Sequence, residues 1–143
     1  MTLRSTLLSL IAISTFSTGC MRKPVFFETG MSQFTAEDAY SARAVKRVSQ
    51  RMKITRRSSV VLVGMTDIQG DASTNQSLSQ QRAEYVRDQL IREGVDANRI
   101  TVVGLGEVEA QRKRAVDRRV EFVYHRTTKG APDSDTLRDR FAK

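Results

Sequence analysis

Apolar residues recur along this chain with two different periods, which predict strands and helices in alternation. The run 60–63 is short, continuous and β-branched, which indicates a strand buried on both faces. The last strand has Val120, Phe122 and Tyr124 on one face. Strands are predicted at Val25–Phe27, Val60–Val63, Ile100–Val103 and Arg119–Tyr124.

A helical period separates the first two strands. Thr35 and Asp38 have the spacing of an N-cap and N3 residue, which predicts a helix that starts near Ala36. One stripe of this helix, with a residue at every fourth position and Val45 beside it, would face the sheet: Tyr40, Ala44, Val48 and Met52.

A second helix is predicted from about Leu78 to Glu93. Ser77 and Gln80 have capping-box spacing at its start, and Gly94 suits a left-handed C-cap. The segment 68–76 is then a polar loop. Two strand-helix units and a final strand predict an α/β fold, a two-layer sandwich of one sheet covered by helices.

Length and charge limit the functions that this chain can have. Its 143 residues suffice for one domain with a proper core. A net charge of +8 indicates an anionic neighbourhood: nucleic acid, anionic lipid or cell-wall polymer. The outer side of the first helix carries a run of cations that continues beyond the helix: Arg43, Lys46, Arg47, Arg51, Lys53, Arg56 and Arg57. This run is either a solvated face or a contact with an anionic surface.

Catalytic and metal-binding patterns are missing from the sequence. His125 and Cys20 are the only His and Cys, and they lie far apart, so they provide neither a catalytic set nor a metal site. Gly104 and Gly106 suggest a dinucleotide loop, but Glu109 stands where a third Gly is required. We therefore expect no enzyme activity, no metal and no cofactor.

The N-terminal segment has the features of a secretion signal. Arg4 precedes a short apolar stretch, 7–16, and the small residues 17–19 stand directly before Cys20. This resembles a bacterial lipoprotein signal, which implies cleavage before Cys20, acylation of that residue and localisation at the outer membrane, facing the periplasm. Met21 stands where an inner-membrane retention signal has Asp.

These features predict four segments. A signal peptide covers 1–19, a lipidated tether 20–24, the folded domain 25–124 and a polar C-terminal tail 125–143. Leu137 and Phe141 are four apart and would suit a short helix in the tail, but we expect a frayed terminus, or else a docking peptide for a partner.

Asp67 and Arg82 are placed unusually for charged residues. Asp67 follows the buried strand, while Arg82 falls in the first turn or so of the second helix, in an otherwise apolar row with Leu78 and Val86. A cation there is disfavoured by the helix dipole, so the guanidinium should meet an anion. Either Asp67 and Arg82 form an internal salt bridge, or they stand apart and grip a zwitterion.

A set of spaced motifs extends this picture over roughly Val25 to Tyr124. It consists of Gly64-Met65-Thr66-Asp67, Gly70, Asn75, Leu78-Ser79, Arg82-Ala83, Arg99-Ile100, Gly104-Leu105-Gly106-Glu107 and Asp117-Arg118-Arg119-Val120-Glu121. The set resembles the OmpA-like peptidoglycan-binding domain. Met65 replaces the usual His of that family, and Asp117 a frequent Asn.

The resemblance implies a mixed four-stranded sheet and a binding site for the cell wall. Asp67 and Arg82 would clasp the free amino-acid end of meso-diaminopimelate in the peptidoglycan stem peptide. Thr66 and Asn75 would either shape the pocket floor or form ordinary turn hydrogen bonds, and Arg119 would either touch the stem peptide or be an edge-strand charge.

The function that follows is a lipid-anchored tether between the outer membrane and peptidoglycan. It would serve a stabiliser of the envelope of the Tol-Pal type, or anchor a secretion or conjugation apparatus to the wall, so envelope proteins are possible partners. A nucleic-acid-binding protein is the alternative from another class. It is disfavoured by the secretion signal and by the few aromatic residues within the basic run.

Overall fold

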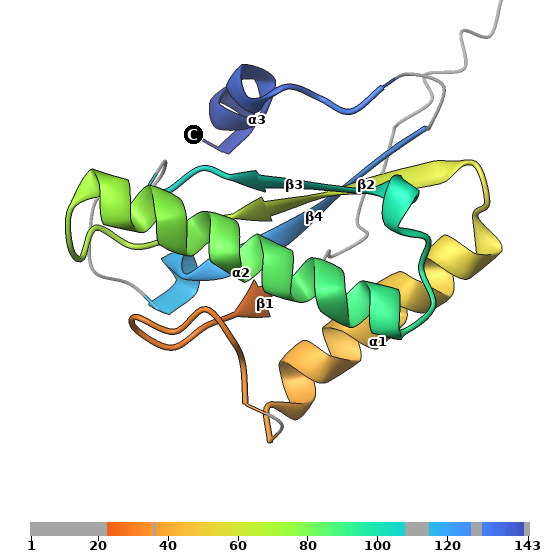
Figure 1. Ribbon diagram of the computed structural model, residues 1–143, viewed down its shortest axis with the longest axis horizontal. Helices are drawn as coiled ribbons and strands as arrows, with labels where there is room; N and C mark the ends of the chain where they lie inside the picture. Colours follow the sequence, from red (N-terminus) through yellow and green to blue (C-terminus); the bar gives the residue numbers. More distant parts are fainter. Residues whose placement is uncertain (1–22, 36, 108–114, 127–129, 142–143) are drawn as a thin grey trace, which may run out of the picture.

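The computed structural model describes residues 23–35, 37–107, 115–126 and 130–141 (Figure 1). The predicted signal peptide and Cys20 lie outside these residues. No helix within the described part of the chain has the length and apolar character needed to cross a membrane.

Four strands form one mixed sheet in the order β1-β4-β2-β3. The parallel pair β2 and β3 places Val60 opposite Ile100, and β4 runs antiparallel to both β1 and β2. The predicted mixed four-stranded α/β fold is confirmed. The strands are β1 (Val25–Phe26), β2 (Ser58–Gly64), β3 (Ile100–Gly104) and β4 (Arg119–Arg126).

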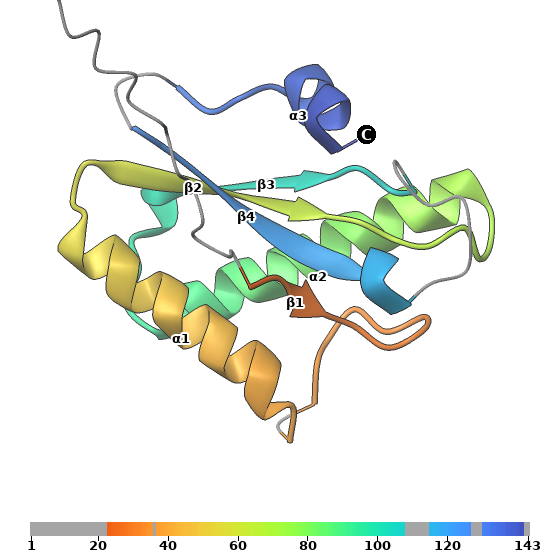
Figure 2. The same ribbon diagram turned by 180° about the vertical axis from the view of Figure 1, so that it is seen from behind.

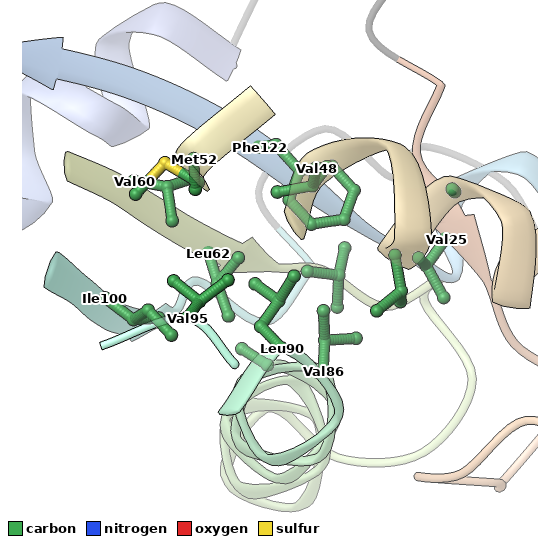
Figure 3. Close-up of a cluster of buried hydrophobic side chains, with 14 of the residues drawn as sticks. Val25, Val48, Met52, Val60, Leu62, Val86, Leu90, Val95, Ile100 and Phe122 are labelled. Atoms are coloured by element: carbon green, nitrogen blue, oxygen red, sulfur yellow. The ribbon is translucent and has the colours of Figure 1, made fainter. Parts of the chain in front are cut away.

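Helices α1 (Ala39–Ile54) and α2 (Ala72–Arg92) cover one face of the sheet (Figures 1 and 2). Their apolar stripes meet alternate residues of the strands in the main core, shown in Figure 3. Tyr40 lies at the rim of the predicted stripe of α1 and stays exposed against Phe26. The core includes Val25, Ala44, Val45, Val48, Met52, Val60, Leu62, Ala83, Val86, Leu90, Ile100, Val120 and Phe122.

A third helix, α3 (Ser134–Phe141), lies on the opposite face of the sheet (Figures 1 and 2). Leu137 is only 1% exposed in a cluster with Val61 and Val63, and Phe141 packs against this cluster. The prediction of a frayed terminus is therefore wrong. The continuous apolar run of β2 presents side chains to both faces, and α3 removes the second set from water.

Both large helices begin at a different residue from the one predicted. The carboxylate of Asp38, and not Thr35, caps α1 by accepting hydrogen bonds from the amides of Tyr40 and Ser41. Asp71, and not Ser77, caps α2 through the amide of Thr74 at 2.9 Å. A carboxylate that collects several N–H and O–H donors outcompetes the single hydroxyl of a Ser or Thr.

The early start of α2 adds more than a turn of polar helix before Ser77, exposed except at Asn75, and its polarity is that of a loop. The predicted end is confirmed, since Gly94 has φ +85° directly after the C-cap Glu93. Two short 3-10 helices, η1 (Ala97–Arg99) and η2 (Ala115–Asp117), precede β3 and β4.

Two glycines bring α2 close to the sheet. Gly64 and Gly104 face each other across β2 and β3, and a Cβ at Gly64 would overlap the main-chain carbonyl of Ser79. A Cβ at Gly104 would come within 2.6 Å of the amide nitrogen of Gln80. This contact fixes the first half of α2 over the ends of the two strands, beside the turn that carries Asp67.

Candidate functional site

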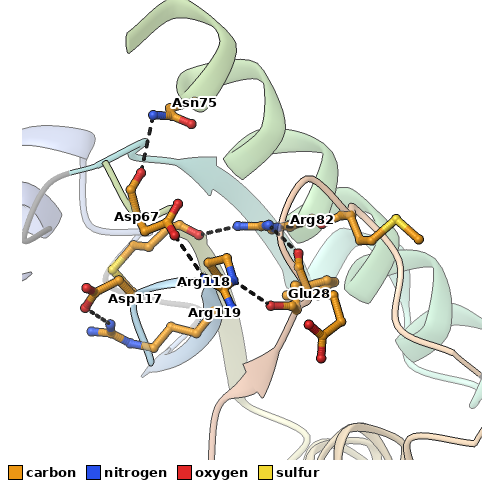
Figure 4. Close-up of polar contacts among 10 residues, drawn as sticks. Glu28, Asp67, Asn75, Arg82, Asp117, Arg118 and Arg119 are labelled. Atoms are coloured by element: carbon orange, nitrogen blue, oxygen red, sulfur yellow. Dashed lines mark hydrogen bonds and ion pairs between the residues drawn. The ribbon is translucent and has the colours of Figure 1, made fainter. Parts of the chain in front are cut away.

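Asp67 lies three residues beyond the end of β2 and is 4% exposed. Its Oδ2 accepts a hydrogen bond from Nη1 of Arg118 at 3.0 Å, which makes a buried ion pair (Figure 4). A carboxylate taken this far out of water requires such a partner, because desolvation disfavours its charge. The negative charge at the end of β2 is therefore fixed by Arg118.

Arg118 was not among the site residues that the sequence predicted. It directly precedes β4, and its Nε donates to the carbonyl of Phe27 at 3.1 Å while its own carbonyl accepts from the amide of Phe27 at 2.9 Å. The alternation of inward and outward side chains along β4 could have indicated that Arg118 points inward. Val120 faces the core, so a side chain two residues earlier points to the same side of the sheet.

Arg82 is completely buried on α2, on the helix face that packs against the sheet. Its guanidinium donates to three main-chain carbonyls, those of Met31 at 2.8 Å, Met65 at 3.1 Å and Glu28 at 3.2 Å. The Phe27 ring lies 5.2 Å from its Cζ. Arg82 thus ties the segment after β1 to the end of β2.

The local electrostatics of Arg82 differ from the prediction. Because α2 begins at Ala72, Arg82 falls in its third turn, so the unfavourable interaction with the helix N-terminus does not arise. Burial lowers the pKa of Arg82 to about 10, the positive charge of Arg118 lowers it too, and Asp67 opposes the shift. The side chain is still a cation at neutral pH.

Asp67 and Arg82 do not form the internal salt bridge that was one of the two alternatives. Asp67 pairs with Arg118, and the described partners of Arg82 are neutral carbonyls. The cluster of Asp67, Arg82 and Arg118 therefore holds two cations and one anion. One positive charge in the buried cluster has no carboxylate bonded to it from the described part of the chain.

Thr66 and Asn75 both support the turn around Asp67. The side-chain amide of Asn75 donates to the carbonyl of Asp67 at 3.3 Å and to Oε2 of Glu107 at 2.9 Å. The amide of Thr66 donates to the carbonyl of Gly106, while its buried Oγ1 has no hydrogen-bond partner among the described residues. These hydrogen bonds join residues far apart in the sequence, so they are not local turn contacts, and Thr66 takes part through its main chain alone.

Arg119 is turned to the other side of β4 from Arg118. Its Nε donates to Oε1 of Glu121 at 2.9 Å, and its Nη1 lies 3.8 Å from Oδ1 of Asp117. Both contacts place Arg119 in an acidic neighbourhood that balances its charge, and neither of them involves Asp67.

A cavity of about 440 Å³ adjoins the cluster. Arg118 lines it, as do Glu28 and Met31, whose carbonyls bind Arg82. Aromatic and aliphatic side chains, among them Phe26, Phe34 and Val116, form much of its wall. Asp67 and Arg82 do not line the cavity, but each is bonded to residues that do. No group of three or more potential metal ligands occurs within the described residues.

The fold and this cluster define a small α/β domain that holds buried charges at one end of a mixed sheet. A family model described as the OmpA family matches residues 26–122, so the chain belongs to the OmpA family. The proteins of this family are non-enzymatic, which supports the prediction that this chain is not an enzyme.

Relatives of known name cover the same domain. The chain is 40% identical over 83 residues to outer membrane porin F of Pseudomonas fluorescens, with 54% of this chain and 26% of the porin covered. It is 38% identical over 85 residues to the peptidoglycan-binding protein ArfA of Mycobacterium tuberculosis, covering 55% and 26%. Over 87 residues it is 37% identical to the probable lipoprotein YiaD of Escherichia coli, covering 57% and 40%.

The chain thus spans between about a quarter and two fifths of the length of these relatives. Among solved structures, the peptidoglycan-associated lipoprotein of Burkholderia pseudomallei is similar, with a TM-score of 0.66 at 28% identity. That alignment covers 72% of this chain and 90% of the other. The C-terminal domain of Helicobacter pylori MotB shares the fold, with a TM-score of 0.60 at 19% identity.

Proposed function

We propose that this chain binds peptidoglycan without covalent bonds and holds an outer membrane to the cell wall. In this proposal Cys20 carries the lipid anchor, on the periplasmic side of the outer membrane. Asp67 and Arg82 recognise the free amino-acid end of meso-diaminopimelate in the stem peptide. Envelope or secretion-system proteins are further partners, and nucleic acid is not.

The surplus positive charge of the Asp67, Arg82 and Arg118 cluster is the observation that carries the proposal. A doubly charged amino-acid terminus brings an ammonium for Asp67 and a carboxylate for the two guanidinium groups. The carboxylate would neutralise the charge that the protein leaves unbalanced. Because Asp67 and Arg82 do not form an ion pair with each other, no ion pair between these two residues has to break before a ligand binds.

Access to Arg82 is the second step of the proposal. Its guanidinium is covered by the segment 28–31, whose carbonyls it binds. A carboxylate is a stronger acceptor for a guanidinium than a neutral carbonyl, so the ligand replaces these carbonyls when the segment moves aside. The adjoining cavity, which Arg118, Glu28 and Met31 line, provides the approach.

The relatives support both halves of the proposal. One is named as a peptidoglycan-binding protein, another as a probable lipoprotein, and a similar solved structure is a peptidoglycan-associated lipoprotein. A single clasp of this size binds weakly. Many copies on one membrane that face one polymer gain by effective concentration.

Sedimentation with purified sacculi tests the binding site. The full chain, Asp67→Ala, Arg82→Lys and a control, Arg87→Ala on the same helix, are incubated with sacculi and the bound fraction is measured. We expect the control to remain bound. We expect Asp67→Ala to lose most retention and Arg82→Lys to weaken it, because a lysine cannot form the bidentate fork of an arginine.

Competition with free meso-diaminopimelate separates site recognition from general charge attraction. We expect the zwitterion to release the wild-type chain and the compound with both carboxylates amidated to have no effect. A circular dichroism melt of each variant checks that it is folded. Retention of folded Asp67→Ala at the wild-type level would refute the assignment of the site.

A further inference from the structure

The positive charge of this chain is concentrated in one stretch. Between Asp38 and Asp67 the sequence holds seven Lys and Arg residues and no acidic residue, so the rest of the chain sums to only +1. The stretch covers α1 and the turn into β2. Because the positive charge is concentrated in one part of the molecule, its electrostatic field attracts anions mainly to that part.

Part of this charge gathers at one end of the sheet, where Arg126 of β4 joins it. We call this region, with its apolar residue Ile54, the basic end: Lys53, Ile54, Arg56, Arg57 and Arg126. Ser58 pairs with Arg126 where β2 begins and β4 ends. There Arg56, Arg57 and Arg126, with Thr55 and Ser58, line an open cavity of about 460 Å³. Lys53, Arg56 and Arg126 are exposed, and their side chains have no ion pair with any described residue.

The basic end also exposes an apolar side chain. Ile54 is the last residue of α1 and is 82% exposed, directly beside Lys53 and close in sequence to Arg56. Nucleic acid provides phosphates but no apolar phase for an isoleucine, and stacking on bases requires aromatic side chains. A bilayer with anionic headgroups provides both phosphates and an apolar boundary.

The direction of the strands places the basic end away from the Asp67 cluster. Asp67 follows the far end of β2, and the six steps from Ser58 to Gly64 span roughly 20 Å. Because β1 and β2 both run antiparallel to β4, the chain enters β1 from the side of the basic end. β1 itself lies beside the Asp67 end of β2, since Val25 pairs with Val120, which also pairs with Gly64.

From these observations we propose that the basic end is a docking surface for anionic phospholipid headgroups, with Ile54 entering the interface. Docking there turns the Asp67 cluster away from the membrane. The surface acts independently of acylation at Cys20 and of any ligand at Asp67. It therefore goes beyond the wall-binding function, and sacculus retention tests the latter separately.

The lack of tryptophan in the chain makes the orientation measurable. Ile54→Trp reports from the basic end, and Val116→Trp from a 53% exposed position at the opposite end. Each full-length variant is added to vesicles of phosphatidylcholine with brominated acyl chains, with or without phosphatidylglycerol. We expect quenching of Ile54→Trp in the anionic vesicles alone, and no quenching of Val116→Trp in either.

Charge variants test the recognition step in the Ile54→Trp background. Lys53→Gln, Arg56→Gln and Arg126→Gln together should lower the ratio of docked to undocked protein by about 100-fold. Arg87→Gln, Arg138→Gln and Arg140→Gln together remove the same charge from α2 and α3 and should leave the ratio unchanged.

Three results would overturn the proposal. The first is equal quenching at both positions, and the second is quenching at residue 54 that persists in neutral vesicles. The third is binding of a duplex DNA fragment that the basic-end variants abolish, without quenching by lipid. That result would assign the surface to nucleic acid.

Discussion

Asp67 should matter more for stability than Arg118, although the two form one ion pair. Asp67→Asn leaves Arg82 and Arg118 as two buried cations with no anion between them, whereas Arg118→Gln leaves one cation and one anion. We expect Asp67→Asn to lower the free energy of unfolding by about 3–5 kcal/mol, the cost of an uncompensated buried charge. Arg118→Gln should lower it by about 1.5–3 kcal/mol, the contribution of the charged hydrogen bond to Asp67, because the glutamine amide can still donate to the carbonyl of Phe27.

The double variant Asp67→Asn/Arg118→Gln provides a sharper test. Removing the second cation relieves the repulsion that Asp67→Asn creates, so the double variant should be about 2 kcal/mol more stable than the sum of the single changes predicts. Urea denaturation of the full chain, followed by circular dichroism at pH 7, measures all four free energies. An unchanged slope with denaturant shows that the unfolding reaction is the same.

The reasoning fails if Arg118→Gln costs as much as Asp67→Asn. It also fails if the two changes are additive, because the cluster would then not act as a unit with a surplus of positive charge. A matched control is Arg87→Gln, on the same helix as Arg82, which removes a cation outside the cluster and should change the free energy by less than about 0.5 kcal/mol.

Leu137→Ala should cost about 2–3 kcal/mol and expose the amides of α3 to hydrogen exchange, while Ile54→Ala should cost almost nothing; equal protection of α3 in both would refute its docking. Gly64→Ala should cost about 3 kcal/mol by thermal melting, since Ser79 cannot yield; a neutral effect would contradict the close approach of α2. Hydrogen bonds from Ser73 and Thr74 hold the pKa of Asp71 below its usual value, so the N-cap is fully formed above about pH 4 and weakens as the pH falls further. The melting temperature of Asp71→Asn should therefore depend less on pH below about pH 4 than that of the wild type. Identical pH profiles would show that the cap does not cause the pH dependence.

The strands and the fold class followed from the sequence because each rests on a local pattern. The run 60–63 and the alternation of Val120 and Phe122 are decided by burial, and the burial of apolar side chains is the main driving force of folding. The start of α2 was missed because Ala72 to Gln76 has no large apolar side chain and only Asn75 among these residues is buried, so no apolar period marks the stretch as helix. Asp71, a residue type that favours the N-cap position, was the one indication in the sequence that the helix begins there.

The site could be predicted only in part. The unusual position of Arg82 in an apolar row identified a buried cation, but its partners are carbonyls of Glu28, Met31 and Met65, and main-chain groups leave no trace in the sequence. The choice between a salt bridge and separated charges therefore needed the structure. The inward position of Arg118 could have been predicted from the sequence, since Arg118 shares the inward face of β4 with Val120.

The short β1 strand has a mechanical consequence. A force that pulls the chain at Val25 toward the basic end runs along the strand axis and loads its hydrogen bonds to β4 in shear. Two paired residues would yield easily, but Phe27 is joined to Arg118 by two hydrogen bonds, and the next segment is held by Arg82. Tension applied at the N-terminal side is thus carried by the residues of the charged cluster, so that a ligand bound there would reinforce the joint that bears the load.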